Sequence, residues 1–174
     1  MINNIVFFVS APLTKRDYKR FGAEIFVSNG FNVLFYDVSP YVYPELYKKS
    51  VLHDRYEGGL TVPLHNKAEI IRSIKHLSVD SLVILIMHYR YNTFFIYSCL
   101  SRLRLNYAIS LINCIPSKPF NMRAKVRYYL QLSKFTPIAV YSKIRNIVYS
   151  PRLAKYLGIK APSMLLLGGE ISLN

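Results

Sequence analysis

Short apolar runs alternate with stretches of helical spacing along most of this chain. Runs rich in β-branched and aromatic residues predict strands over Asn4–Ser10, Asn32–Asp37, Ser81–Met87, Tyr107–Asn113 and Ser163–Leu167. These runs are apolar almost throughout instead of alternating with polar residues, which is typical of parallel strands buried on both faces. We therefore expect a sheet that is covered on two sides.

Apolar residues at helical spacing between these runs predict the covering helices. The longer helices are expected over Lys15–Ser28, Lys67–Leu77, Thr93–Arg104 and Asn121–Ser133. Shorter or mixed helical stretches are expected over Pro44–Ser50, Ile138–Ile147 and Pro151–Leu157. From Val38 to Leu64, prolines and glycines interrupt the apolar spacing, so no helix or strand is predicted there apart from Pro44–Ser50.

Helix starts are marked by polar residues that can cap them. Thr14 followed by Asp17 resembles a capping box, and Asn66 and Asn92 are expected N-caps of later helices. Gly22 falls inside the first predicted helix, where we interpret it as a close-packing position.

Alternation of buried strands and helices predicts an α/β fold. The expected architecture is a Rossmann-like, open, mostly parallel sheet with helices on both faces, forming one domain over residues 1–174. Ligands of such sheets bind outside the carboxyl ends of the strands. The candidate loops are therefore Ser10–Asp17, Asp37–Tyr43, His88–Asn92, Asn113–Lys118 and Gly168–Glu170.

The charge of the chain is strongly positive and unevenly distributed. Lys and Arg number 23 and Asp and Glu number 9, which gives a formal net charge of +14. Residues 81–169 contain thirteen of the basic residues and no Asp or Glu. This asymmetry favours a basic face that meets phosphates, an anionic membrane surface or an acidic neighbour, although a solvated surface has the same composition.

The turn after the first strand is the stretch richest in candidate chemistry. Its residues expected to bind an anion are Ser10, Thr14, Lys15, Arg16 and Arg20. Arg16 and Arg20 lie one helical turn apart and repel each other weakly, and a bound anion would offset this repulsion. Asp17 relieves the same repulsion, so a plain solvated helix face also fits this spacing.

His88, Tyr89 and Arg90 follow the third strand directly. If that strand neighbours the first one, these residues lie at the mouth of the sheet beside the first loop. Histidine is suited to general-base chemistry near neutral pH, although a histidine at a strand end is often structural. His88 and Asp17 are the candidate catalytic residues, and Tyr89 and Arg90 are candidate binding residues.

Several function classes are disfavoured by missing motifs. The chain has no GxGxxG after its first strand, no GxxxxGK[ST], no GxSxG and no HExxH. His and Cys residues lack zinc spacing, so we expect neither a metal nor a cofactor. No apolar run approaches the roughly 18 residues that span a bilayer, and the two cysteines lie in apolar segments, so we expect a cytoplasmic protein.

The opening NIVFFVSAPLTKRDYKRFGAEIFVSNGFNVLFYDVSPY resembles the starts of bacterial glycosyltransferase-like proteins from lipopolysaccharide and capsule gene clusters. The shared features are a strand, a short loop, a helix, a GF-x-V lead into the second strand and a D-x-[ST] exit. The later run SVDSLVILIMHYRYNTFFIYSCLSRLRLNYAISLINCIP is similar to the middle of a GT-B N-terminal domain. The resemblance covers most of the chain.

This resemblance implies the acceptor-side half of a two-domain enzyme for surface polysaccharide synthesis. Such an enzyme transfers a sugar from a nucleotide-sugar donor to a glycan or lipid-linked acceptor. The donor-binding half has no counterpart here, so a C-terminal donor domain or a partner chain would have to complete the enzyme. A lipid-linked acceptor would place the basic domain peripherally at the inner membrane face. The alternative is a non-catalytic basic Rossmann-like module that binds nucleic acid or a protein partner.

Overall fold

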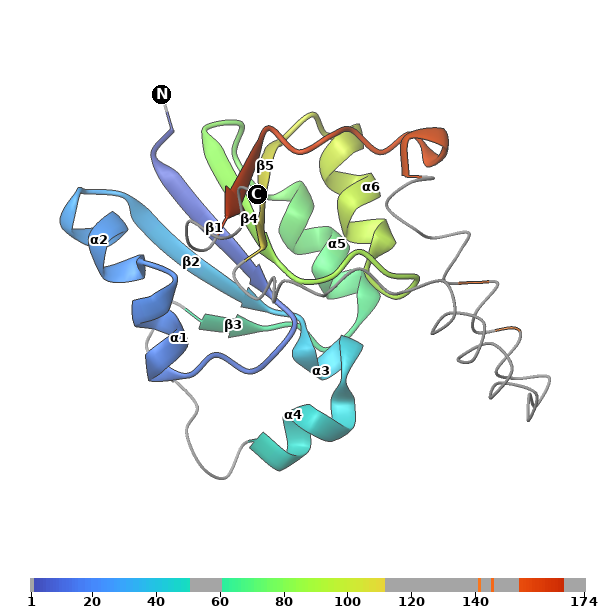
Figure 1. Cartoon of the computed structure of the whole chain (residues 1–174), viewed down its shortest axis with the longest axis horizontal. Coiled ribbons are helices and arrows are strands. Elements are labelled where there is room, and N and C mark those ends of the chain that lie inside the picture. Colours follow the sequence, from blue (N-terminus) through green and yellow to red (C-terminus); the bar gives the residue numbers. More distant parts are fainter. Residues whose placement is uncertain (1, 51–60, 112–140, 142–144, 146–153, 168–174) are drawn as a thin grey trace, which may run out of the picture.

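Six short strands form one parallel sheet in the computed structural model, which describes residues 2–50, 61–111, 141, 145 and 154–167 (Figure 1). The strands are β1 (Asn4–Val9), β2 (Asn32–Asp37), β3 (Thr61–Pro63), β4 (Ser81–Ile86), β5 (Asn106–Leu111) and β6 (Met164–Leu167). Their order is β3-β2-β1-β4-β5-β6, and every neighbouring pair is parallel. This order is that of Rossmann folds, so the predicted fold class is confirmed.

The strand order reverses between β1 and β4: β2 and β3 are added on one side of β1, and β4, β5 and β6 follow on its other side. In their register Val9 lies opposite Ile86, so the two strands end level with each other. The central strand β1 is buried along most of its length, and Phe7 stacks on Phe35 of β2 with ring centroids 4.6 Å apart. Aromatic stacking and burial on both faces explain why this short run forms a strand.

The first predicted helix is two helices, α1 (Lys15–Arg20) and α2 (Ala23–Ser28). The break lies at Gly22, whose φ of 70° is left-handed. Our interpretation of Gly22 as a close-packing position within one helix is therefore wrong. Glycine adopts this conformation without the steric penalty of a Cβ atom, and it lets the chain turn between the two helices.

Two further helices and one strand lie in the interrupted stretch after β2. Helix α3 spans Ser39–Val42, helix α4 spans Pro44–Ser50 as predicted, and β3 adds the edge strand. The buried carboxylate of Asp37 accepts a hydrogen bond of 2.8 Å from the Ser39 backbone N–H, which holds the start of α3. Neither α3 nor β3 is predicted by the sequence pattern, because both are too short to show a period.

Helices α5 (Lys67–Lys75) and α6 (Phe94–Arg102) cover the face of the sheet opposite to α1 and α2. The predicted cap of α5 is confirmed, since Asn66 Oδ1 accepts a hydrogen bond of 2.9 Å from the Glu69 N–H. The predicted cap of α6 is wrong. Its N-cap residue is Thr93 and not Asn92, and the Thr93 hydroxyl donates to the His88 carbonyl instead of capping the helix.

Two apolar clusters lie on the two faces of the sheet. Figure 1 shows α1 and α2 on one side of the sheet and α5 and α6 on the other. Leu13, Tyr18 and Ala23 from the α1–α2 segment pack on one face. Ile70, Ile74 and the buried residues of α6 pack on the other face. The loops that follow β1 and β4 therefore start side by side and then diverge to opposite faces.

The end of the described chain crosses back to the sheet. A 3-10 helix, η1 (Ala154–Leu157), replaces the described part of the predicted helix Pro151–Leu157, and Gly158 with a φ of 72° ends it as predicted. The predictions for Asn113–Lys118, Asn121–Ser133 and Gly168–Glu170 lie outside the described residues, as does most of Ile138–Ile147.

Candidate functional site

Two loops leave the carboxyl edge of the sheet at the point where the strand order reverses. The β1–α1 loop carries Ser10 and Thr14, and the β4–α6 loop carries His88, Tyr89 and Arg90. Adjacent pairing of β1 with β4 confirms the expected neighbourhood of these loops. Open α/β sheets bind ligands in this position because the loops that follow the two strands lead to opposite faces and leave a crevice between them.

Hydrogen bonds between the Thr93 and Tyr97 hydroxyls and the backbone fix the shape of the β4–α6 loop. The Thr93 hydroxyl donates to the His88 carbonyl at 2.7 Å and accepts from the Arg90 N–H at 2.9 Å. The Tyr97 hydroxyl donates to the Met87 carbonyl at 2.9 Å from the next turn of α6. These bonds satisfy the polar backbone of the loop and hold its side chains in fixed directions.

A cavity of about 560 Å³ lies between this loop, α6, β5 and the segment from η1 to β6. Its lining residues are Met87, His88, Tyr89, Arg90, Tyr97, Tyr107, Ile109, Ala154, Lys155, Ile159, Lys160, Ala161, Pro162 and Leu165. The volume falls within the range of small-molecule sites. The cavity therefore contains three of the predicted site residues, His88, Tyr89 and Arg90.

The wall formed by α6 and β5 is apolar and uncharged. Tyr97 and Tyr107 are each 2% exposed, and their rings meet edge to face at 6.1 Å. Their hydroxyls donate to the carbonyls of Met87 and Lys160, so the phenol groups are used within the protein. Burial raises the pKa of both tyrosines, which therefore stay neutral at physiological pH.

The rim of the cavity is basic. The exposed side chains of His88 and Arg90 come from one side, and those of Lys155 and Lys160 come from the other. None of the lining residues in the described part of the chain is Asp or Glu. A concave site with cations on two sides and no acidic residue attracts anions, and an apolar wall beneath them strengthens that attraction.

Long-range hydrogen bonds place Lys160 at this rim. Its backbone N–H donates to Ser101 Oγ at 3.0 Å, and its carbonyl accepts from the Tyr107 hydroxyl. Ile159 next to it is buried in the core of the α6 face, and the Ser163 N–H donates to the Tyr107 carbonyl at 2.8 Å. The segment before β6 is thereby tied to both α6 and β5.

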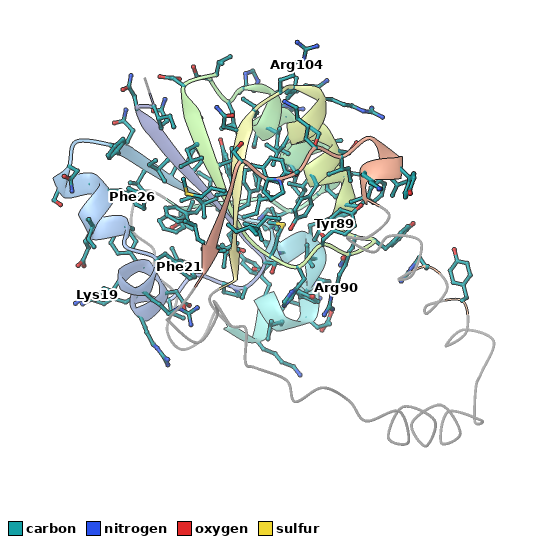
Figure 2. The ribbon with its side chains drawn as sticks, turned by 45° about the horizontal axis from the view of Figure 1, so that its top comes forward. Lys19, Phe21, Phe26, Tyr89, Arg90 and Arg104 are labelled. Atoms are coloured by element: carbon teal, nitrogen blue, oxygen red, sulfur yellow. The ribbon has the colours of Figure 1, made fainter. Side chains whose placement is uncertain are left out.

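The predicted residues of the first loop do not line this cavity. Ser10 and Thr14 are half-buried, whereas Lys15, Arg16 and Arg20 are exposed along the α1 segment. Figure 2 shows Lys19 and Phe21 of this segment on one side of the molecule and Tyr89 and Arg90 on the other. The structure thus separates the predicted residues into two groups.

Asp17 makes the contacts of a helix cap. Its backbone N–H donates to Thr14 Oγ at 3.1 Å, as the sequence predicted, and its carboxylate accepts from the Thr14 hydroxyl at 2.8 Å. The same carboxylate forms an ion pair of 3.0 Å with Arg20. These contacts give Asp17 a structural role at the start of α1, and its catalytic role stays a prediction.

Sequence reasoning missed Tyr97, Tyr107, Lys155 and Lys160. Tyr97 lies on α6 and Tyr107 on β5, where each looks like an ordinary core residue in the pattern. Lys155 and Lys160 reach the site only because β6 pairs with β5. The absence of acidic residues from 81 to 169 was the one sequence signal that these elements share.

Metal and membrane features are absent from the described part of the chain. Its residues hold no cluster of three or more His, Cys, Asp or Glu side chains fit to bind a metal ion. Among the helices described, none has the length and apolarity to cross a membrane. Comparison with family models, curated proteins and solved structures finds no match to this chain.

Proposed function

We propose that the chain is the acceptor-side domain of a glycosyltransferase-like protein in surface polysaccharide synthesis. Its cavity binds the phosphate-bearing end of a glycan or lipid-linked acceptor. The nucleotide-sugar donor is then supplied from a C-terminal donor domain or a partner chain. The domain works in the cytoplasm, peripherally at an anionic membrane surface.

One observation carries this proposal: the cavity beside β5, between the β4–α6 loop and the segment that precedes β6, combines an apolar wall with a basic rim. A phosphate group needs hydrogen-bond donors and a positive potential. Arg90, Lys155 and Lys160 all line this cavity. An apolar group joined to that phosphate finds the tyrosine wall beneath the rim. The strand order agrees with the fold expected from the resemblance.

Each rim residue has a distinct role in this proposal. Arg90 offers the planar, two-pronged donor geometry that suits a phosphate, and the two lysines add compact positive charge. His88 is the candidate general base, because an imidazole at the mouth reaches an acceptor hydroxyl held by its phosphate. Tyr89 packs edge to face on Tyr97 at 5.0 Å and forms part of the wall.

Thermal stability of the purified chain tests the proposal against a panel of candidate ligands. The panel contains a sugar 1-phosphate, a prenyl diphosphate, uridine diphosphate, anionic lipid vesicles and single-stranded oligonucleotides, each at two salt concentrations. A ligand that binds only the native state raises the melting temperature. We expect a rise with the sugar phosphate or the prenyl diphosphate that is lost in Lys155→Ala/Lys160→Ala.

Arg72→Ala/Lys75→Ala is the matched control, since it removes two exposed cations of α5 outside the cavity. It should keep the response of the unmodified chain. A response to oligonucleotides alone that disappears at high salt would contradict the proposal and favour the basic binding module. The charge excess over residues 81–169 is the observation behind that second function.

A further inference from the structure

The guanidinium group of Arg145 lies over the ring of Tyr91, in the β4–α6 loop, and over that of Tyr141. Its Cζ is 4.2 Å from the ring centroid of Tyr91 and 5.8 Å from that of Tyr141. Its Nε atom is buried and has no hydrogen-bond partner in the part of the chain that the structure describes. Cation–π contacts thus hold the guanidinium in place, and a ligand has to reach its two Nη groups because Nε is buried.

Carboxylates do not neutralise this cation within the described residues. The ion pairs found there join Arg20 to Asp17 and Lys48 to Glu45, both on other elements. A guanidinium that is already held in place and has no carboxylate partner is suited to bind an external anion, because little conformational entropy of its side chain is lost on binding. Arginine binds a carboxylate through two parallel hydrogen bonds.

A second arginine–tyrosine pair lies beside the first. Arg90 Nη1 is 3.5 Å from the hydroxyl oxygen of Tyr43, which belongs to the turn between α3 and α4. Tyr91, Tyr43 and Tyr141 are 41%, 36% and 66% exposed. We call these residues the arginine–tyrosine surface: Tyr43, Arg90, Tyr91, Tyr141 and Arg145.

The arginine–tyrosine surface continues directly from the cavity. Arg90 lines the cavity and also contacts Tyr43, and Tyr91 is the next residue of the same loop. A ligand held by its phosphate at the rim would therefore run out over this surface. In Figure 2, Arg90 extends from that loop toward the neighbouring helices α3 and α4.

We propose that the arginine–tyrosine surface binds an acidic glycan, the chain that continues from the phosphate-bearing end in the cavity. The inference rests on the proposed function. A carboxylate of the glycan pairs with Arg145, and exposed tyrosine side chains contact the apolar faces of its sugar rings. Single-stranded nucleic acid suits the surface less well, because Arg145 covers one part of Tyr91 and Phe94 stacks near it at 6.5 Å.

Calorimetric titration of the full chain with tetragalacturonate tests the inference, with neutral maltotetraose as the comparison ligand. We expect tetragalacturonate to bind about tenfold more tightly than maltotetraose, and Arg145→Ala to remove that difference. Tyr91→Ala should weaken binding because it frees the guanidinium, whereas Tyr91→Phe should keep it. Arg72→Ala, which removes an exposed arginine of α5, should bind like the unmodified chain.

The inference would be overturned by equal binding of the two tetrasaccharides, or by unchanged tetragalacturonate affinity in a folded Arg145→Ala variant. It would also be overturned by an oligonucleotide that binds more tightly and displaces tetragalacturonate. The two proposals fail separately. If the unmodified chain binds tetragalacturonate but no phosphate ligand, the phosphate site in the cavity is contradicted. If it binds a phosphate ligand but not tetragalacturonate, the glycan site on the arginine–tyrosine surface is contradicted.

Discussion

The hydroxyl of Tyr107 on β5 donates a hydrogen bond to the carbonyl of Lys160, 53 residues further along the chain. This bond joins the wall of the cavity to its rim, because Tyr107 forms the wall and Lys160 carries one of the cations. The same tyrosine ring packs against Tyr97 of α6. The position of the rim therefore depends on a core residue.

Tyr107→Phe should loosen the rim while keeping the apolar wall. The Lys160 carbonyl loses its donor, which costs about 1 kcal/mol of unfolding free energy. For a chain of this size we expect a fall in melting temperature of about 2–4 °C and weaker binding of the phosphate ligand. Urea unfolding and calorimetric titration measure the two effects. Unchanged ligand affinity in the destabilised variant would show that the rim does not need this bond.

Alkaline pH should destabilise the chain through its buried tyrosines. Burial raises the pKa of Tyr97, so above about pH 10 the unfolded chain releases this proton while the folded chain keeps it. The unfolded state then binds fewer protons, and the unfolding free energy decreases as the pH rises. Urea unfolding at a series of pH values should show a shallower decline in Tyr97→Phe. Tyr156→Phe, which removes an exposed hydroxyl, is the control.

Gly22 should tolerate no ordinary side chain without cost. Its φ of 70° is left-handed, and a Cβ there would lie 3.9 Å from Ile25 Cδ1, an ordinary contact. The cost of Gly22→Ala is therefore backbone strain of about 1 kcal/mol, and not a steric clash. Gly22→Asn should lose less, because Asn adopts left-handed conformations more readily. Equal stability of Gly22→Ala and the unmodified chain would contradict the break between α1 and α2.

Asp17→Ala separates a capping role from a catalytic one. The substitution removes the ion pair with Arg20 and the contact with the Thr14 hydroxyl, and we expect a loss of roughly 0.5–1 kcal/mol of unfolding free energy. Affinity for the phosphate ligand should not change, because Asp17 does not line the cavity. A stable Asp17→Ala variant that no longer binds the phosphate ligand would instead show that Asp17 belongs to the functional site, as the sequence predicted.

Much of the sheet is visible in the sequence because its strands are apolar on both faces. The bounds of β2 are those predicted, and the cap at Thr14 follows from its spacing to Asp17. The break at Gly22 is hidden, since the apolar spacing of α1 continues into α2 without interruption. Local spacing cannot report a turn that depends on one backbone angle.

The candidate site was predictable only on one side. His88, Tyr89 and Arg90 were found because they follow a strand that ends at the carboxyl edge. Lys155 and Lys160 could not be found, because their place depends on the pairing of β6 with β5 and on the bond from Tyr107. Contacts between residues so far apart in sequence leave no periodic signal.

The most direct measurement is the dissociation constant of a prenyl diphosphate or sugar 1-phosphate for the unmodified chain and for Lys155→Ala/Lys160→Ala. We expect the double variant to bind the ligand about tenfold to a hundredfold more weakly, while Arg72→Ala/Lys75→Ala binds as before. Equal affinity in the two double variants, or no binding by the unmodified chain, would contradict a phosphate site in this cavity.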